Sequence, residues 1–290
     1  MAGLKEIRRR ISSVKNTKQI TRAMKLVSAA KLRRAQDAAI SGRMFGSRLK
    51  SIIASVVQEL PENFEHALLR KTEGTKRRLL IVIAGERGLC GAYNTNIVKA
   101  VAASEPQGGV GANVIAVGRR AVSGGRRSQW NILSGHESLP EDPSKWPVDA
   151  IAKEAVEEFM AEKYDEVVVY YTKFVSAMTQ QVTSEVLFPL SAENLVSKDG
   201  DAAAAAHTRF DAPVADMFAT LIPLYISARI REAALESKAS EHAARMTAMD
   251  SASKNASDLI DRLRLFYNRA RQSAITTELI HNNGGAEAVK

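Results

Sequence analysis

Residues 224–283 read LYISARIREAALESKASEHAARMTAMDSASKNASDLIDRLRLFYNRARQSAITTELIHNN, a run of 60 residues that contains neither glycine nor proline. Both residues disfavour helix interiors, so their absence over this length predicts one uninterrupted helix. At ~1.5 Å per residue such a helix would extend for roughly 90 Å. The mean helix of a globular protein has only about 11–12 residues. The length therefore excludes a core helix of a compact domain.

The face of this helix that is expected to meet a partner carries unusually small side chains. Small residues let two helix backbones approach closely, although they bury less apolar area than leucine or isoleucine would. Larger side chains return toward the C-terminal end. The expected stripe consists of Ala233, Ser237, Ser240, Ala244, Ala248, Ser251 and Asn255, followed by Leu259, Leu263 and Phe266.

A second long helix is predicted for residues 2–60, where apolar side chains recur at helical spacing. Pro61 is expected to end this helix because proline cannot continue the hydrogen-bond ladder. Gly42 and Gly46 are positions where the helix is expected to bend or loosen. The apolar stripe begins with Leu4, Ile7, Ile11 and Val14, and after a small drift it is expected to continue through Ile20, Met24 and Val27.

The two segments are the only long helical partners available to each other, which predicts an antiparallel two-helix coiled coil. An α/β domain would be inserted between its two arms. The alternative is a pair of separate amphipathic helices that pack on that domain. The predicted organisation is an N-terminal coiled-coil helix at 1–60, an α/β domain at 76–195 and a C-terminal coiled-coil helix at 211–283. Pro213 is expected in the first turn of the last helix, Pro223 is expected to kink its opening, and residues 197–209 are expected to connect it flexibly.

Residues 76–195 alternate strand and helix signals, which predicts a Rossmann-like α/β domain with a partly parallel sheet. The run RLLIVIA at 78–84 is typical of a strand buried on both faces. Further strands are expected at 110–117 and 166–171, and residues 179–187 are expected to pair beside the last one as a hairpin. Helices are expected from an N-cap at Asn94 to Ala103 and over 148–163. The fold class is therefore mixed, α+β or α/β, with the long coiled coil as its main feature.

The charge of the chain is concentrated at its N-terminus. The formal net charge is +9, but residues 1–50 hold 14 basic and two acidic side chains, so this segment carries +12 and the rest of the chain −3. Such asymmetry concerns partners rather than fold. The single cysteine, Cys90, excludes a disulfide framework and a multi-cysteine zinc site. No apolar run approaches the ~20 residues of a membrane span, and no secretory signal is present.

A glycine-rich turn, Gly85-Glu86-Arg87-Gly88-Leu89-Cys90-Gly91, lies where a strand is expected to meet a helix. Helix N-termini after such turns often hold phosphate groups. The spacing here is GxxGxxG, which is neither the dinucleotide fingerprint nor the P-loop. The second strand ends in Gly118-Arg119-Arg120 rather than in an acidic residue, an arrangement that leaves NADP as an open alternative. We interpret Gly85, Gly88 and Gly91 as a structural tight turn, and a nucleotide-binding or dinucleotide-binding α/β enzyme as the alternative.

Neither a catalytic constellation nor a metal site is found among the scattered histidines and the acids of residues 154–162. We therefore expect no catalytic residues, no metal and no cofactor. The +12 segment raises the alternative of a basic helical nucleic-acid-binding protein. Residues 1–50 contain one aromatic side chain, Phe45, and hence no stacking platform. The charges also surround the helix instead of keeping to one face, which favours a helix that meets acidic protein partners on several sides.

Several long motifs resemble the γ subunit of F-type ATP synthase. The opening MAGLKEIRRRISSVKNTKQITRAMKLVSAAKLRRAQ resembles that family's N-terminal helix, and ERGLCGAYN at 86–94 resembles its central turn. SEHAARMTAMDSASKNA at 240–256 and YNRARQSAITTEL at 267–279 resemble its C-terminal helix. The resemblance covers essentially the whole chain. It departs at the tip, where residues 280–285 read IHNNGG instead of an EIVGGA-type ending.

The resemblance implies a mechanical role. In this family the coiled coil is a central shaft inside a ring of α and β subunits, and the α/β domain is a foot that binds the ε subunit and the c-ring. Proton flow turns the c-ring and the shaft, which drives the β subunits through their nucleotide-binding states. The chain itself would not be catalytic and would reach the membrane only through the c-ring. Its start at Met1 without a transit peptide favours the cytoplasmic face of a bacterial inner membrane, as a peripheral protein.

The resemblance also assigns roles to individual residues. Contacts to a β subunit are implied for six positions near two levels of the shaft, and a role in coupling is implied for two positions on its lower part. Because exposed ion pairs contribute only ~0–1 kcal/mol each, contacts of this kind can be exchanged as the shaft turns. The six are Arg22, Met24, Lys25, Arg271, Gln272 and Thr276, and the two are Glu241 and Arg245.

Overall fold

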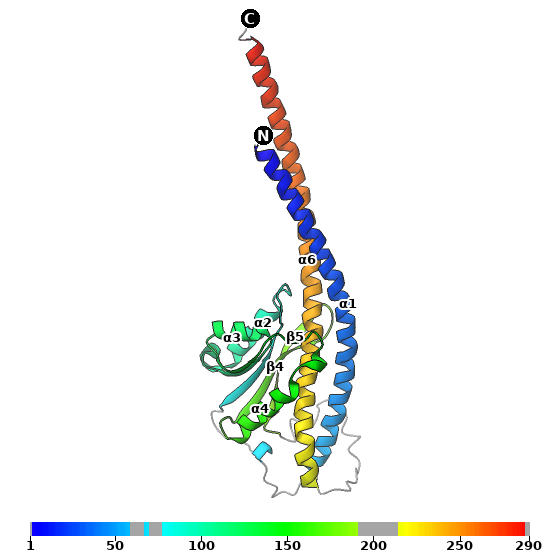
Figure 1. The fold of residues 1–290 in the computed structure, drawn as a ribbon, viewed down its shortest axis with the longest axis vertical. Coiled ribbons are helices and arrows are strands. Elements are labelled where there is room, and N and C mark those ends of the chain that lie inside the picture. Colours follow the sequence, from blue (N-terminus) through cyan, green and yellow to red (C-terminus); the bar gives the residue numbers. More distant parts are fainter. Residues whose placement is uncertain (1, 59–66, 70–76, 191–213, 288–290) are drawn as a thin grey trace. The chain divides into compact units, whose positions relative to one another are not determined.

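The computed structural model describes residues 2–58, 67–69, 77–190 and 214–287. It contains two very long helices, α1 (Ala2–Gln58) and α6 (Val214–Glu287), and a five-stranded sheet (Figure 1). The chain divides into two units, one of Met1–Ala29 with Arg245–Lys290 and one of Ala30–Ala244. Both long helices are therefore confirmed. The expected stop at Pro61, the expected opening at 211–213 and the connection at 197–209 lie outside the described residues.

In the first unit, α1 and α6 run antiparallel. Lys18 Nζ donates a 3.0 Å hydrogen bond to Ser257 Oγ, and Lys25 Nζ lies 2.5 Å from Asp250 Oδ1. Rising residue numbers on α1 thus meet falling numbers on α6. Arg8 extends the pairing toward the N-terminus, because its guanidinium donates to the Tyr267 hydroxyl at 2.6 Å. The antiparallel arrangement expected of the coiled coil is present here.

The seam of α1 differs from the expected one. The prediction is right at the buried Ile7 and at the half-buried positions Leu4, Ile11, Val14 and Met24, but it is wrong at Ile20 and Val27, which are 60% and 55% exposed. Beyond Val14, the buried and half-buried positions on α1 instead keep the strict alternation of three and four residues, through Lys18, Thr21, Lys25 and Ser28. A seven-residue repeat of this kind follows a supercoiled partner, whereas the expected drift assumed a straight helix with 3.6 residues per turn.

The seam of α6 is displaced for the same reason. Ser251 and Asn255 are exposed, and Leu259 and Phe266 are 45% and 59% exposed, so the expected stripe is wrong at these positions. The side chains that are buried or half-buried follow the seven-residue repeat instead. They are Met249, Ser253, Ala256, Ile260, Leu263 and Tyr267.

The second unit holds a mixed sheet in the order β3-β2-β1-β4-β5. Its first four strands in this order are parallel, and β5 pairs antiparallel with β4, as the hairpin prediction required. β3 is absent from the prediction because its sequence, NILSGH, lacks both an apolar run and a clean alternation. The strands are β1 (Arg78–Ile83), β2 (Asn113–Val117), β3 (Asn131–His136), β4 (Glu166–Phe174) and β5 (Gln180–Phe188).

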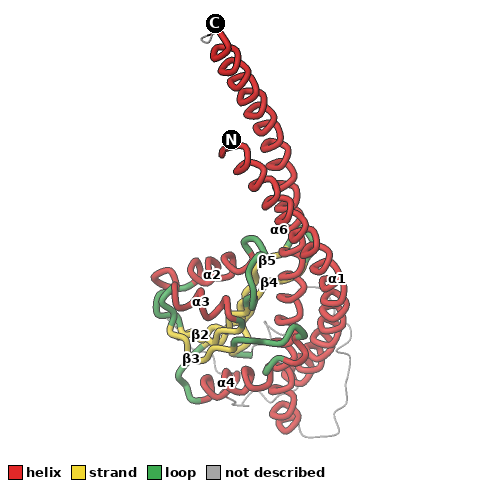
Figure 2. The backbone as a smooth tube through the Cα atoms, turned by 45° about the horizontal axis from the view of Figure 1, so that its top comes forward, coloured by secondary structure: helices red, strands yellow, loops and turns green. Residues whose placement is uncertain are grey.

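Helices cover both faces of this sheet (Figure 2). α2 (Tyr93–Ser104) and α3 (Arg119–Arg127) pack on one face, over a core that includes Leu80, Val82 and Ile97. α4 (Val148–Met160) packs on the other face, where the core also contains side chains of α1 and α6. α3 was not expected, since its paired glycines and four arginines give no helical apolar stripe. Short 3-10 turns lie at Ala67–Leu69, Pro106–Gly109 and Pro143–Lys145.

α1 continues without a break through Gly42 and Gly46, where the sequence predicted a bend. A Cβ atom on Gly42 would lie 2.8 Å from Leu235 Cδ1 of α6, and a Cβ on Gly46 would overlap the Glu232 carboxylate. The two glycines therefore allow α1 and α6 to approach closely in the second unit. α6 likewise continues across Pro223.

Candidate functional site

The glycine-rich turn after β1 is organised by the side chain of Asn94. Its Oδ1 accepts a 2.9 Å hydrogen bond from the Gly85 amide, while its Nδ2 donates to Arg87 O at 3.2 Å and to Cys90 Sγ at 3.1 Å. The expected N-cap role of Asn94 is wrong, because α2 begins one residue earlier and its first turn has no side-chain cap. Asn94 instead reaches back from inside the helix and occupies an amide donor that a phosphate group would need.

The same turn packs against α6. A Cβ atom on Gly85 would lie 3.0 Å from Asn94 Oδ1 and 3.3 Å from the Glu241 carboxyl carbon, so any larger residue would have to shift these side chains. At the start of α2, the buried Tyr93 hydroxyl donates to Ser237 O at 3.0 Å. Burial raises the pKa of the Tyr93 hydroxyl, with the nearby Glu241 charge adding to this effect. Tyr93 is therefore a neutral donor at physiological pH.

Two serines of the expected coiled-coil seam bond to the sheet instead. Ser240 Oγ donates to Thr172 O at 3.0 Å, and the Thr172 amide donates to Ser237 Oγ at 3.3 Å. Both serines are buried, with exposed fractions of 0% and 2%. Their small size lets α6 lie directly on the edge of β4, so they join helix to sheet within the second unit.

A buried carboxylate, Glu236, ties three elements together. Its Oε2 accepts a 2.8 Å hydrogen bond from the Phe174 amide at the end of β4, and its Oε1 accepts from Arg43 Nε of α1 at 3.0 Å. The Glu236 side chain is only 2% exposed. Buried carboxylates are costly unless paired and hydrogen-bonded, and Glu236 meets both conditions.

A second buried ionic group lies two turns earlier on α6. Arg229 pairs with Glu185 of β5 and with Glu232 of its own helix. Burial alone would lower the pKa of the Arg229 guanidinium, but the two carboxylates outweigh it and raise that pKa above its usual value. Burial in turn raises the pKa of Glu232, although Arg229 opposes the shift. The network fixes α6 to the outer strand of the sheet.

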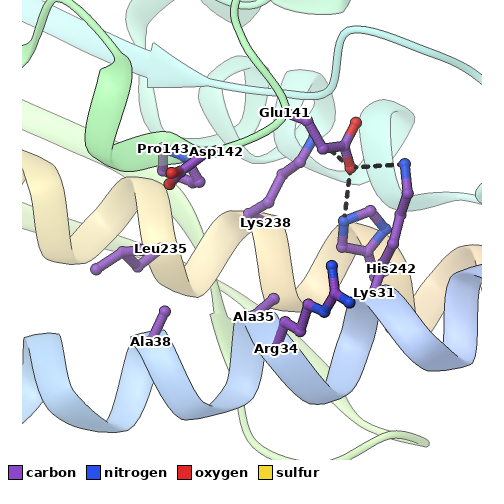
Figure 3. Close-up of a pocket in the computed structure, with 10 residues that line it drawn as sticks. All are labelled: Lys31, Arg34, Ala35, Ala38, Glu141, Asp142, Pro143, Leu235, Lys238 and His242. Atoms are coloured by element: carbon purple, nitrogen blue, oxygen red, sulfur yellow. Dashed lines mark ion pairs between the residues drawn. The ribbon is translucent and has the colours of Figure 1, made fainter.

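A third cluster surrounds Glu141, on the loop before α4 (Figure 3). Its Oε1 lies 3.1 Å from His242 Nε2, 3.2 Å from Lys31 Nζ and 3.7 Å from Lys238 Nζ. Burial disfavours the Glu141 carboxylate, but Lys238, Lys31 and His242 outweigh this and lower its pKa. One loop carboxylate thus bridges α1 and α6 beside a cavity of about 390 Å³.

Comparison with known proteins identifies the family. The sequence matches the ATP synthase family over residues 3–289. It is 41% identical to the ATP synthase gamma chain of Trichlorobacter lovleyi and 40% identical to that of Geobacter sp. strain M21, and each alignment covers 100% of both chains. The chain belongs to the ATP synthase gamma-chain family. Its role is therefore that of a central-stalk rotor subunit that is not itself catalytic.

Solved structures agree with the fold of a gamma chain. A chain from the central stalk and c-ring structure of the Tetrahymena thermophila mitochondrial ATP synthase is 26% identical, with a TM-score of 0.60, covering 81% of this chain and 99% of that one. A chain from the Euglena gracilis mitochondrial ATP synthase rotor is 17% identical, with a TM-score of 0.64, covering 94% and 99%. The second likeness concerns the fold alone.

The gamma-chain positions expected to contact a β subunit differ in their surroundings. Arg22 is exposed, Met24 is half-buried, and Lys25 is already paired with Asp250 inside the chain. On the C-terminal part of α6, Arg271, Gln272 and Thr276 are exposed, and the Thr276 hydroxyl donates to Gln272 O at 3.0 Å. Each of these residues except Lys25 has its side chain available for an external contact.

The two positions expected to act in coupling are buried. Glu241 is 4% exposed and lies 3.1 Å from Lys238 Nζ, and Arg245 is 9% exposed.

The other two glycines of the glycine-rich turn differ in their surroundings. Gly88 faces the Arg120 guanidinium, and Gly91 has the left-handed φ of 57° that glycine adopts freely. Among the described residues, no cluster of three or more potential ligands can hold a metal ion, and no helix is long and apolar enough to cross a membrane.

Proposed function

We propose that this gamma chain transmits torque from its α/β domain to the shaft through the three ionic junctions at Glu236, Arg229 and Glu141. The single observation that carries the proposal is the Glu236 carboxylate, which binds α1 through Arg43 and the sheet through the Phe174 amide. A domain joined to a helix only by apolar contacts could slide, whereas directional hydrogen bonds to a buried carboxylate fix the register.

The proposed partners are the α and β subunits of the catalytic ring, the ε subunit and the c-ring. The shaft would turn inside the ring, and the α/β domain would bind ε and the c-ring, so that c-ring rotation changes the nucleotide-binding states of the β subunits. The support is the family, together with the central stalk and c-ring assembly that contains the Tetrahymena relative. The proposed location is the cytoplasmic face of a bacterial inner membrane, reached only through the c-ring; the similar gamma chains come from bacteria.

Within this proposal, Arg22 and Met24 meet an acidic loop of each β subunit in turn, and Arg271, Gln272 and Thr276 meet a β subunit higher in the ring. Arg22, Arg271, Gln272 and Thr276 are exposed, which supports the assignment, and Met24 is half-buried. The Lys25 ammonium group would interact both with Asp250 and with the ring of α and β subunits. Glu241 and Arg245 would act from inside the chain, by holding the lower shaft in shape.

Met24→Lys tests the proposed contact. The added charge should bind the acidic loop and lower the number of protons pumped per ATP hydrolysed in reconstituted vesicles, while assembly stays intact. Met160→Lys is the matched control, because Met160 is 45% exposed at the end of α4, on the α/β domain. An unchanged pumping ratio for Met24→Lys, or an equal loss for both variants, would contradict the proposed contact.

The two alternatives from the sequence have direct tests of their own. Micromolar ATP or NADP binding to the isolated chain, measured by calorimetry, would support a nucleotide site at the glycine-rich turn. DNA affinity with a steep salt dependence would support nucleic-acid binding by residues 1–50. We expect neither, because Asn94 takes the Gly85 amide and no aromatic platform accompanies the basic segment.

A further inference from the structure

The outer surface of α2 and α3 is strongly basic. The sequence of α3, RRAVSGGRR, places four arginines in nine residues, and all four are exposed. Its apolar positions, Ala121 and Val122, are buried against the sheet. Residues 87–104 and 119–128 together hold six basic side chains and no acidic one. The core on the opposite face of the sheet contains side chains of α4 and the long helices, and on this side α6 meets the start of α2 and the turn before it (Figure 2).

The arginines differ in what they already bind. Arg119 lies 3.9 Å from Glu86, whose carboxylate also accepts hydrogen bonds from the Arg119 and Ser138 amides. Within the described parts of the chain, neither Arg120 nor Arg127 forms an ion pair with an acidic side chain. Two guanidinium groups are thus left with unsatisfied charge on one face of one helix.

A hollow of about 310 Å³ lies between these two arginines and the glycine-rich turn. Arg120, Ser123, Arg127 and Ser128 line it from α3 and its end, and Thr95 lines it from α2. Among the described residues that line it, none is acidic. Leu89 stands at its edge, 63% exposed, on a backbone with φ 61°. A bulky residue in that conformation is uncommon, and here it presents an apolar side chain beside two cations.

We infer that this hollow is a docking site for an acidic segment of a protein partner. An arginine guanidinium can bind a carboxylate through two parallel hydrogen bonds. Such paired bonds favour acidic side chains as the ligands of Arg120 and Arg127. Arg120 and Arg127 are seven residues apart, so their Cα atoms are separated by roughly 10 Å along the helix. The occupant therefore carries two carboxylates at about that spacing, with an apolar side chain between them against Leu89.

Other anionic partners fit the surface less well. Single-stranded nucleic acid binds on exposed aromatic side chains, and the two aromatic residues next to the hollow in sequence, Tyr93 and Trp130, are buried. A membrane surface would call for a row of apolar side chains, and Leu89 is the one large exposed apolar residue among the described lining residues. The acidic polypeptide is the occupant that uses both the arginines and Leu89.

A binding experiment on the purified full chain tests the chemistry. The probe is a fluorescent peptide of sequence EELEELEE, with QQLQQLQQ as its neutral counterpart, and the readout is anisotropy at low salt. Arg120→Glu with Arg127→Glu should weaken binding at least ten-fold. Arg87→Glu with Lys99→Glu is the matched control, since it makes the same charge change on the same surface outside the hollow, and it should weaken binding less than three-fold. Equal losses, or no binding of the acidic peptide, would overturn the inference.

A second arm identifies the partner and rests on the proposed assembly into ATP synthase. A photo-crosslinking residue at Arg126, beside the hollow, should link to one other chain of the purified complex, in a segment with at least two carboxylates. The yield should fall at least five-fold with the Arg120 and Arg127 reversals and persist with the control pair. Links only to lipid, to an acid-free segment or to nothing would overturn the inference, as would tighter binding of the purified chain to a 12-nucleotide DNA or to phosphatidylglycerol vesicles than to the peptide. Because the peptide arm needs no complex, a failure of the rotor proposal alone would leave it unchanged.

Discussion

The Thr21 hydroxyl of α1 and the Ser253 hydroxyl of α6 lie 2.8 Å apart and form a hydrogen bond across the seam of the antiparallel pair. Lys18 with Ser257 and Lys25 with Asp250 flank this bond on either side. The middle of the seam is therefore polar, and its two helices are aligned by specific bonds instead of interlocking leucines. Polar seam positions commonly fix register at some cost in stability.

Thr21→Val should destabilise the first unit by about 1 kcal/mol, because it leaves the Ser253 hydroxyl without its partner in a half-buried seam. Adding Ser253→Ala should recover part of this loss, since both polar groups are then gone. Denaturant unfolding of the full chain measures both variants and the Ser253→Ala single variant. Strictly additive free energies would show that the two hydroxyls do not interact.

Gly46→Ala should cost about 1–3 kcal/mol, because a Cβ at this position would overlap the Glu232 carboxylate, which Arg229 holds in place. Gly3→Ala is the control: no described atom lies within 4 Å of a Cβ there, so it should change the unfolding free energy by less than about 0.5 kcal/mol. Gly46→Ala should thus lower the melting temperature, and Gly3→Ala should leave it nearly unchanged. A stabilising Gly46→Ala would mean that the helices are not in close contact at this level.

Arg43→Met should destabilise the second unit by about 2 kcal/mol, since the buried Glu236 carboxylate loses its cationic partner. Arg48→Met, at an exposed position on the same helix, should stay within about 0.5 kcal/mol of the parent. In the assembled enzyme, the first variant should also lower the coupling of ATP hydrolysis to proton pumping more than the second. Equal effects of the two changes on unfolding would contradict a specific junction at Glu236.

Glu141→Gln should remove a pH-dependent contribution to stability. The folded-state pKa of Glu141 lies below its ordinary value of 4.5, so the ionised carboxylate stabilises the fold above the unfolded pKa, and this contribution is lost as the pH falls through the folded value. Because the side chain is half exposed, the expected loss at pH 7 is about 1 kcal/mol. Unfolding curves of parent and variant should converge below about pH 4.

Glu137→Gln, at an exposed position on the same loop, provides the comparison. Its unfolding free energy should follow that of the parent from pH 7 to pH 4. A constant difference between Glu141→Gln and the parent over this range would mean that the ionised form of Glu141 contributes nothing.

The long helices, the hairpin and the parallel strands other than β3 could be predicted because each is encoded locally, by the absence of glycine and proline or by an apolar run. The seam register could not, since Ile20 and Val27 suit a straight helix as well as Lys18 and Thr21 suit a supercoiled one. The choice between these two registers is made by the hydrogen bonds that Lys18 and Thr21 form with Ser257 and Ser253 of α6.

The ionic junctions at Glu236, Arg229 and Glu141 also could not be predicted from the sequence. Arg43 and Glu236 are 193 residues apart, and nothing near either residue identifies the other. Asn94 shows the same limit at short range. Asparagine is a common N-cap residue, but here the Asn94 side chain accepts a hydrogen bond from the Gly85 amide, nine residues earlier.

The bond between Arg8 and Tyr267 joins residues separated by 259 positions, almost the full length of the chain. During synthesis α1 leaves the ribosome first, and α6 follows only when the last part of the chain has been translated. At a translation rate of about 5–20 residues per second, roughly 10–50 s pass before α6 can cover the seam of α1. Because Lys18, Thr21 and Lys25 lie in this seam, the part of it that follows Val14 stays polar until α6 is made, and we expect it to associate less with other nascent chains than a seam of leucines would.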